Sequence, residues 1–127
     1  MRRSSIKSEL SPLFRGVYAA IFRLRRPRRL HVGRLGALLF PAGLYVYVGS
    51  AQRNLPARLR RHGLRHKPLR WHIDYLSIRA ELIGAVVVRG PKTLECKLAA
   101  KLAQFAAQSV PAFGCTDCCC RSHLFRL

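Results

Sequence analysis

Hydrophobic segments alternate with turn residues along the chain in a way that predicts strands and helices in succession. Residues 45–48 are aromatic and β-branched, a composition typical of a strand. The small residues 49–51 are expected to end this strand in a tight turn, because they allow close approach to the backbone. Asn54 then predicts a helix start, since Asn accepts hydrogen bonds as an N-cap and Pro56 suits the first turn.

Three other apolar segments predict strands. Residues 16–24 and 30–40 precede the turn signal at 41–43, so we expect them to form an antiparallel meander with the strand at 44–48. Residues 80–88 form a nearly continuous apolar run. Such a run suits a strand that is buried at the centre of a sheet.

The first predicted helix spans residues 55–66. Arg58 and His62 lie four residues apart on it, so they share one face at the margin of its apolar seam. Arg60 and Arg61 point away from that seam and are expected in solvent. Arg58 is therefore the arginine of this helix that we expect to be held in place.

A short helix is expected at residues 68–76 and a longer one at residues 93–108, with Thr93 as its N-cap. The apolar face of the longer helix consists of Leu94, Leu98, Leu102 and Phe105. Glu95 falls inside this face by helical geometry. A lone carboxylate there is costly unless it has a partner, such as a metal ion or a buried arginine. The helix N-terminus stabilises it only slightly.

The chain of 127 residues is long enough for one domain with its own core, and half of its residues are hydrophobic. That share excludes a wholly disordered basic protein. We expect a disordered basic N-terminus at residues 1–12 and a single α+β domain at residues 13–127. The first ten residues lack the apolar stretch of a secretory signal, and the apolar run at 35–49 is too short for a membrane span. A cytoplasmic location is the resulting expectation.

Charge is the strongest feature of the composition. Lysine and arginine number 24 against five acidic residues, which gives a formal net charge of +19 at pH 7. Such an excess opposes compaction and favours a polyanionic partner. Nucleic acid is the first candidate and an anionic membrane surface the second; a basic surface that only keeps the chain soluble is the remaining explanation. We expect DNA as the partner, with RNA as the alternative, and no membrane.

Several short motifs occur in an order that resembles the GIY-YIG nuclease superfamily, and specifically its small Uri-like branch. They are Gly16-Val17-Tyr18, Tyr47-Val48-Gly49, the helix pair Arg58 and His62, and Glu95 on a later helix. Residues 71–76, 113–118 and 123–125 are similar to that branch too, so the resemblance covers residues 14–127. It implies an α+β fold with a small three-stranded antiparallel sheet core, flanked by helices, and an added strand or hairpin.

The resemblance also implies hydrolysis of DNA phosphodiester bonds with one divalent ion, Mg²⁺ or Mn²⁺. Glu95 would bind that ion, and a carboxylate is the hard oxygen ligand that Mg²⁺ prefers. Tyr18 and Tyr47 would lie on neighbouring strands, with Tyr18 orienting or deprotonating the attacking water. Arg58 would stabilise charge on the scissile phosphate through its planar donor fork.

Two histidines and two glycines complete the candidate site. His62 could accept a proton or donate to phosphate. His72 is a supporting residue, expected in a local hydrogen-bond network with Asp74. Gly16 and Gly49 are expected to form structural turns.

Each candidate also has a purely structural explanation. The two tyrosines are ordinary strand aromatics, and the histidines can be hydrogen-bonded core residues. Arg58 is one of 24 basic residues and could position phosphate without catalysis. Asp74, Glu81 and Asp117 are rival metal ligands.

The chain departs from the superfamily pattern in two ways. Its two tyrosine motifs are far apart, which implies an inserted strand pair, and the late active-site asparagine has no clear counterpart. Asp117 or Ser122 could stand in its place. Either departure could mean altered or lost activity. A non-catalytic nucleic-acid-binding module that keeps the fold is therefore an alternative function.

The C-terminal cysteines are compatible with zinc. Cys115, Cys118, Cys120 and His123 have the residue types and spacing of a tetrahedral structural Zn²⁺ site, although they are crowded and Cys119 is an extra thiol. The alternative is that they are reduced thiols, because a cytoplasmic location disfavours disulfides. A zinc-stabilised interaction domain is thus the third candidate function.

Overall fold

The computed structural model describes residues 15–115 and 120–127. Its elements, in chain order, are β1 (Gly16–Leu24), β2 (Arg28–His31), the 3-10 helix η1 (Gly33–Leu35), β3 (Ala37–Phe40), β4 (Gly43–Ala51), α2 (Leu55–Gly63), α3 (His72–Ser77), β5 (Glu81–Val88), α4 (Thr93–Phe105), β6 (Gln108–Ser109) and β7 (Leu124–Arg126). The predicted disordered N-terminus at residues 1–12 lies outside the described residues, as do Asp117, Cys118 and Cys119.

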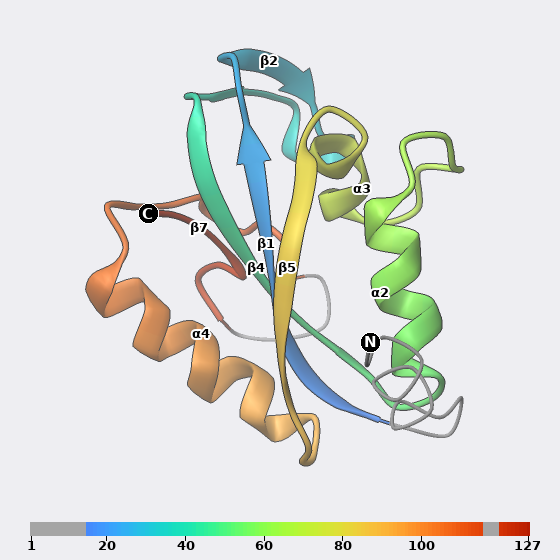
Figure 1. Ribbon diagram of the computed structural model, residues 1–127. Helices are drawn as coiled ribbons and strands as arrows, with labels where there is room; N and C mark the ends of the chain where they lie inside the picture. Colours follow the sequence, from blue (N-terminus) through green and yellow to red (C-terminus); the bar gives the residue numbers. More distant parts are fainter. Residues whose placement is uncertain (1–14, 116–119) are drawn as a thin grey trace.

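A five-stranded antiparallel sheet forms the centre of the described chain, in the order β5-β1-β4-β7-β6. Figure 1 shows α4 on one side of this sheet and α2 with α3 on the other. The mixed α+β class with an antiparallel sheet is therefore confirmed. The sheet is wider than the three strands expected, because β7 pairs with β4 and β6 pairs with β7.

The expected meander of the first three strands is wrong. β1 pairs directly with β4 along its whole length, and the segment between them forms a separate two-stranded sheet of β2 and β3. The predicted strand at 30–40 is interrupted by η1, where Gly33 and Gly36 have φ of 46° and 77°. Glycine adopts these left-handed conformations without a steric penalty, and they end a strand. The β2–β3 pair is the insertion that the long spacing between the two tyrosine motifs implied.

β5 lies at the edge of the sheet rather than at its centre, since β1 is its neighbour among the described strands. Its apolar side chains are accordingly exposed to solvent: Ile83 by 48%, Val86 by 59% and Val88 by 46%. A continuous apolar run predicts a strand well. It does not distinguish a central strand from an edge strand, because no polar face marks the solvent side.

Gly16 and Gly49 lie within strands, so the prediction that they form turns is wrong. β4 continues through Gly49 to Ala51. A Cβ atom on Gly49 would lie 2.5 Å from Tyr18 Oη, and one on Gly16 would lie 2.6 Å from the carbonyl oxygen of Val88. Both glycines are therefore explained by the close approach of a neighbouring group.

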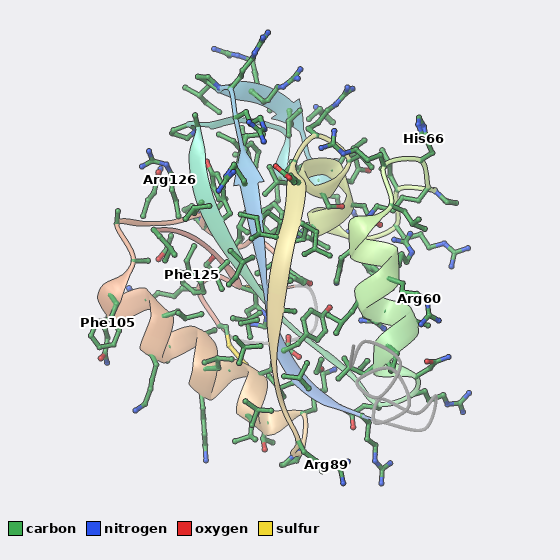
Figure 2. The ribbon with its side chains drawn as sticks, in the orientation of Figure 1. Arg60, His66, Arg89, Phe105, Phe125 and Arg126 are labelled. Atoms are coloured by element: carbon green, nitrogen blue, oxygen red, sulfur yellow. A yellow bond between two sulfur atoms is a disulfide. The ribbon has the colours of Figure 1, made fainter. Side chains whose placement is uncertain are left out.

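Alternation along β1 divides the core between the two sides of the sheet. One set of β1 residues joins a large cluster with residues of α2 and α3: Tyr18, Ala20, Phe22 and Leu24. On the other side Val17 packs with Val48, Ala99 and Phe125 beneath α4, whose leucines cover them. Phe105 was expected on the apolar face of α4, but it is 81% exposed and lies on the outer side of the helix in Figure 2.

The helix boundaries differ slightly from those predicted. The Asn54 side chain accepts a hydrogen bond from the backbone N–H of Ala57 at 3.2 Å, which confirms it as the N-cap of α2. α4 has Lys92 rather than Thr93 at its N-cap, and it ends at Phe105. In the described part of the chain, no helix combines the length and the apolarity needed to cross a membrane.

Candidate active site

A cavity of about 910 Å³ opens where the end of β4, the start of α4 and the loop before α3 meet. Its lining includes five residues of the predicted site: Tyr47, Gly49, Arg58, His72 and Glu95. Five basic side chains also line it: Arg34, Arg53, Arg58, Arg70 and Lys92. Glu95 is the one acid among the described lining residues, and a cleft in which one sign of charge predominates raises the local concentration of counter-charged ligands. The cavity is therefore suited to an anion.

Glu95, in the first turn of α4, presents its carboxylate to this cavity with 14% of the side chain exposed. Ser50 Oγ donates a hydrogen bond to Oε1 at 2.6 Å, and His123 Nδ1 lies 2.8 Å from Oε2. Burial alone would raise the pKa of Glu95, but the bonds from His123 and Ser50 outweigh it and hold the pKa below its usual range. The predicted inward carboxylate is confirmed, with His123 and Ser50 as its partners.

Arg58 is anchored on two sides. Its Nη1 donates to the carbonyl oxygen of Ser50 at 3.1 Å, and its Cζ lies 4.3 Å from the centroid of the Trp71 ring. A guanidinium carries five N–H donors, so one held in this way can still bind a phosphate oxygen. The prediction that Arg58 is held in place is confirmed. Arg60, two residues further on, is exposed and lies on the outer side of α2 (Figure 2).

Tyr18 and His62 form a buried pair behind the cavity wall. Tyr18 Oη lies 2.6 Å from His62 Nε2, and both side chains are at most 1% exposed. Burial, reinforced by Lys67 and Arg58, lowers the pKa of His62 to about 3, so the ring is neutral. Burial also raises the pKa of Tyr18 well above its usual value, despite the opposing charge of Arg58. The phenol therefore keeps its proton, and its oxygen shares a hydrogen bond with Nε2. Among the described residues, His62 Nδ1 has no hydrogen-bond partner.

Of the two predicted tyrosines, Tyr47 is the one that reaches the cavity. Its ring centroid lies 6.4 Å from that of Tyr18 and 5.7 Å from that of His62, and Tyr47 lines the cavity whereas those two residues do not. Burial raises the pKa of Tyr47 far above its usual range. The two predicted tyrosines are thus neighbours on adjacent strands, and they lie at different depths.

His72 lines the cavity but belongs to a different network from the one expected. Its Nδ1 accepts a hydrogen bond from the backbone N–H of Gly114 at 2.9 Å, while Asp74 has other partners. Burial lowers the pKa of His72. Gly114 has φ of 74°, and a Cβ atom there would lie 3.3 Å from the Tyr47 ring. His72 therefore fixes a backbone segment against Tyr47.

Asp74 and Glu81, two of the rival metal ligands, lie outside the cavity lining. Asp74 is fully buried, and its oxygens lie 2.8 Å from Arg61 Nη1 and 2.8 and 2.9 Å from the backbone nitrogens of Arg70 and Trp71. Glu81 forms an exposed ion pair with Arg25 at 3.1 Å. The prediction that Arg61 points into solvent is wrong, because Arg61 pairs with Asp74.

The cysteines differ from the predicted set. Cys96 and Cys120 form a disulfide with a Cα–Cα distance of 6.1 Å, so the expectation that the cysteines are thiols or metal ligands rather than disulfides is wrong for this pair. Packing α4 against the C-terminal segment brings Cys96, 24 residues away in sequence, beside Cys120. The thiol of Cys115 donates to the carbonyl oxygen of Phe113 at 3.4 Å. Cys118 lies outside the described residues.

His123 was expected only as a zinc ligand, and its contact with Glu95 was missed. Its carbonyl oxygen accepts a hydrogen bond from the Val48 backbone N–H at 2.9 Å, so the residue enters the sheet just before β7. The apolar residues 124–127 predict a short strand at the end of the chain. The sequence does not show which strand it pairs with, because that pairing depends on the three-dimensional fold. Ser122, which was considered in place of the asparagine, bonds with the backbone of Leu124.

Comparisons with known proteins add a family. A family model described as "Domain of unknown function DUF123" matches residues 17–127. No match was found among curated proteins or among solved structures.

Proposed function

The chain belongs to the DUF123 family, and we propose that it is a metal-dependent endonuclease that hydrolyses phosphodiester bonds in DNA with one divalent ion. The proposal rests on one observation. An ionised carboxylate, that of Glu95, lines the same basic cavity as the anchored Arg58 and the Tyr47 ring. The order of motifs that resembles the Uri-like branch of the GIY-YIG nucleases supports the same reading.

The donor set of the cavity fits Mg²⁺ or Mn²⁺. Mg²⁺ is commonly bound through one or two carboxylates, with water and substrate phosphate oxygens completing its shell. Glu95 offers such a carboxylate. Ser50 hydrogen-bonds to one of its oxygens and His123 contacts the other, so its position is fixed. When bound, the ion would supply Lewis-acid stabilisation of the phosphoryl oxygens.

Arg58 and Tyr47 would act on the substrate directly. Arg58 binds a non-bridging oxygen of the scissile phosphate, where charge grows as water attacks. Burial raises the pKa of Tyr47, so its hydroxyl stays protonated at neutral pH. Tyr47 therefore orients the attacking water by hydrogen bonding and does not deprotonate it. This role was first expected of Tyr18; we assign it to Tyr47 because Tyr47 lines the cavity.

Tyr18 and His62 are positioning residues in this proposal. Their hydrogen bond of 2.6 Å fixes the Tyr18 hydroxyl close to the Cα of Gly49, which leaves no room for a larger residue. The Tyr47 ring packs against both of them. Their contribution is therefore to hold the wall of the cavity in one arrangement.

A non-catalytic nucleic-acid-binding module is the second candidate function, and a separate arginine cluster favours it. A smaller cavity of about 170 Å³ is lined by six arginines and one acid: Arg23, Arg25, Arg26, Arg28, Arg65, Arg79 and Glu81. None of these residues lines the candidate active site among the described residues. Such a cluster binds phosphate without base contacts or chemistry.

A cleavage panel separates the two functions. End-labelled single-stranded, duplex, flapped and branched DNA, with an RNA of the same sequence, would be incubated with the parent chain in Mg²⁺, Mn²⁺ or EDTA. The variant is Glu95→Gln, which keeps the shape of the side chain. The matched control is Lys97→Gln on the exposed side of the same helix.

We expect metal-dependent cleavage of at least one DNA by the parent and by Lys97→Gln, and its loss in Glu95→Gln. Binding of all the DNAs without cleavage in either metal would support the binding module instead. Cleavage at equal rates by the parent and Glu95→Gln would show that Glu95 does not carry the reaction.

A further inference from the structure

We propose that Cys96, Cys120 and His123 form a second metal site, selective for a thiolate-binding ion such as Zn²⁺, when the Cys96–Cys120 disulfide is reduced. The two sulfurs and one ring nitrogen of His123 all lie within 4.8 Å of one another. In a tetrahedral Zn²⁺ site with Zn–S of about 2.3 Å and Zn–N of about 2.0 Å, ligand atoms are roughly 3.5–3.8 Å apart. Small side-chain movements are enough to reach that geometry.

The residue types separate this site from the oxygen site at Glu95. Two thiolates and an imidazole are soft or borderline ligands, which favour Zn²⁺ over Mg²⁺. His123 is buried and the two cysteines are half-buried, and Cys96 also lines the candidate active-site cavity, so an ion held there would be reached from that cavity. Three protein ligands leave one position of a tetrahedral shell for water or another donor.

The imidazole of His123 is held in place by contacts at its Nδ1 atom. Its Nδ1 lies 2.8 Å from Glu95 Oε2 and 3.2 Å from the carbonyl oxygen of Val48. Because these contacts engage Nδ1, His123 would bind the ion through Nε2. A carboxylate that orients a histidine from behind is the usual outer-shell support of a zinc-bound imidazole.

Disulfide and metal site exclude each other, because both use the same two sulfurs. Oxidation of the zinc dithiolate joins Cys96 Sγ to Cys120 Sγ and releases Zn²⁺. The two electrons pass to a disulfide oxidant such as oxidised glutathione, which leaves as two thiolates. In either state the link joins α4, next to Glu95, to the segment that carries His123.

Cobalt substitution tests this site without relying on cleavage. The full chain would be reduced, freed of metal under anaerobic conditions and titrated with Co²⁺, whose thiolate complexes absorb in the near ultraviolet and visible range. Zn²⁺ would then displace Co²⁺, and bound zinc would be counted by elemental analysis. The variants are Cys96→Ser and Cys120→Ser, with Cys115→Ser as the matched control.

We expect the reduced parent and Cys115→Ser to bind one equivalent of Co²⁺ with thiolate absorption, and Cys96→Ser and Cys120→Ser to lose it. Oxidised glutathione should release one equivalent of zinc from the parent and yield a Cys96–Cys120 peptide in mass mapping. Cys96→His, which keeps a ligand, should retain metal with a weaker thiolate band. Glu95→Gln, whose amide oxygen can still accept a hydrogen bond from His123, should retain the thiolate band with metal affinity lowered by about 10–100-fold, even though cleavage is lost.

Two results would overturn the proposal. One is that the reduced parent takes up no Co²⁺ or Zn²⁺. The other is that Cys96→Ser, folded by circular dichroism, binds metal as the parent does, which would place the ion on other cysteines of the C-terminal segment. Neither result would bear on cleavage at Glu95, so failure of this site and failure of the nuclease proposal are distinguishable.

Discussion

Asp74 and Glu95 are both ionised acids in a strongly basic chain, yet their surroundings differ. Asp74 is fully buried and is compensated by the Arg61 guanidinium and by two backbone N–H groups. Glu95 is held by one hydroxyl and one imidazole, and it keeps an exposed edge in a cavity. An acid whose charge is matched by protein donors supports the fold, whereas one that is left open to a cavity can bind a cation.

The same contrast applies to the arginines that accompany them. Arg61 is committed to Asp74, with 18% of its side chain exposed. Arg58 contacts a carbonyl oxygen and an indole face, neither of which neutralises its charge. The region around Asp74 is therefore nearly complete electrostatically, while the region around Glu95 and Arg58 has unsatisfied charge to offer a substrate.

Arg58→Ala should have the largest effect on the Glu95 side. Removing one preorganised donor to a developing anion typically lowers kcat by about 10²–10³-fold. We expect that loss in single-turnover cleavage of the best DNA substrate. Arg60→Ala, on the exposed side of the same helix, should cleave within about twofold of the parent, because exposed single charges contribute little. Equal losses in both variants would mean that only overall charge matters.

Asp74→Asn should have the largest effect on the folding side. It leaves Arg61 and the buried Lys67, 3.9 Å from Oδ1, without a counter-charge, and breaking a buried pair costs about 3–5 kcal/mol. We expect the lower end, about 3 kcal/mol in the free energy of unfolding by urea, because Arg61 is partly exposed. The exposed acid Glu81, changed to Gln, should cost less than about 1 kcal/mol. A similar cost for both variants would contradict the assignment of Asp74 as a structural acid.

His62 lies between the two regions and should set the acid sensitivity of the fold. Its pKa is about 3 in the folded state against about 6.5 when unfolded, so below pH 6.5 the unfolded chain binds a proton that the folded chain does not. The stability that comes from keeping His62 neutral is therefore fully present above pH 6.5. As the pH falls toward 3, the free energy of unfolding decreases by about 1.4 kcal/mol per pH unit. Urea unfolding at pH 7, 6, 5 and 4 would measure this. His62→Gln should show a flatter profile; identical profiles would refute the assignment.

The smallest effect concerns the arginine cluster away from the cavity. Arg26→Gln and Arg28→Gln should each weaken DNA binding a few-fold and reduce the slope of log affinity against log salt by about 1. Lys97→Gln and Lys101→Gln, on the exposed side of α4, are matched controls and should leave the slope close to the parent value. Titration by fluorescence anisotropy at several salt concentrations measures both. Equal slopes in all variants would show that this cluster does not contact the DNA backbone.

Local patterns predicted most elements of the fold. Composition and alternation identified β1, β4 and β5, Asn54 identified the start of α2, and the period of α4 placed Glu95 on its inward face. The order of the strands in the sheet was not predictable in this way, because an apolar run does not indicate which other strand it pairs with. The insertion of β2 and β3, the edge position of β5 and the pairing of β7 with β4 are all of this kind.

The candidate site was predicted in part for the same reason. Arg58 and Glu95 were found from helix geometry, since each is placed by its own helix. His123 and Cys96 were missed as partners, because their contacts join segments that are distant in sequence. Arg61 was misassigned because its acid lies on another helix. Helical periodicity predicts the direction of a side chain, but it does not predict which residues that side chain contacts.

Binding of Mn²⁺ tests the central claim most directly. Free Mn²⁺ would be followed by electron paramagnetic resonance during titration of the fully oxidised chain, in the presence of a DNA made resistant to cleavage. The variants are Glu95→Gln and, as the matched acid, Glu81→Gln. We predict that the parent and Glu81→Gln bind one ion at the same affinity and that Glu95→Gln loses it. Equal binding by Glu95→Gln and the parent would contradict the claim that this carboxylate holds the metal.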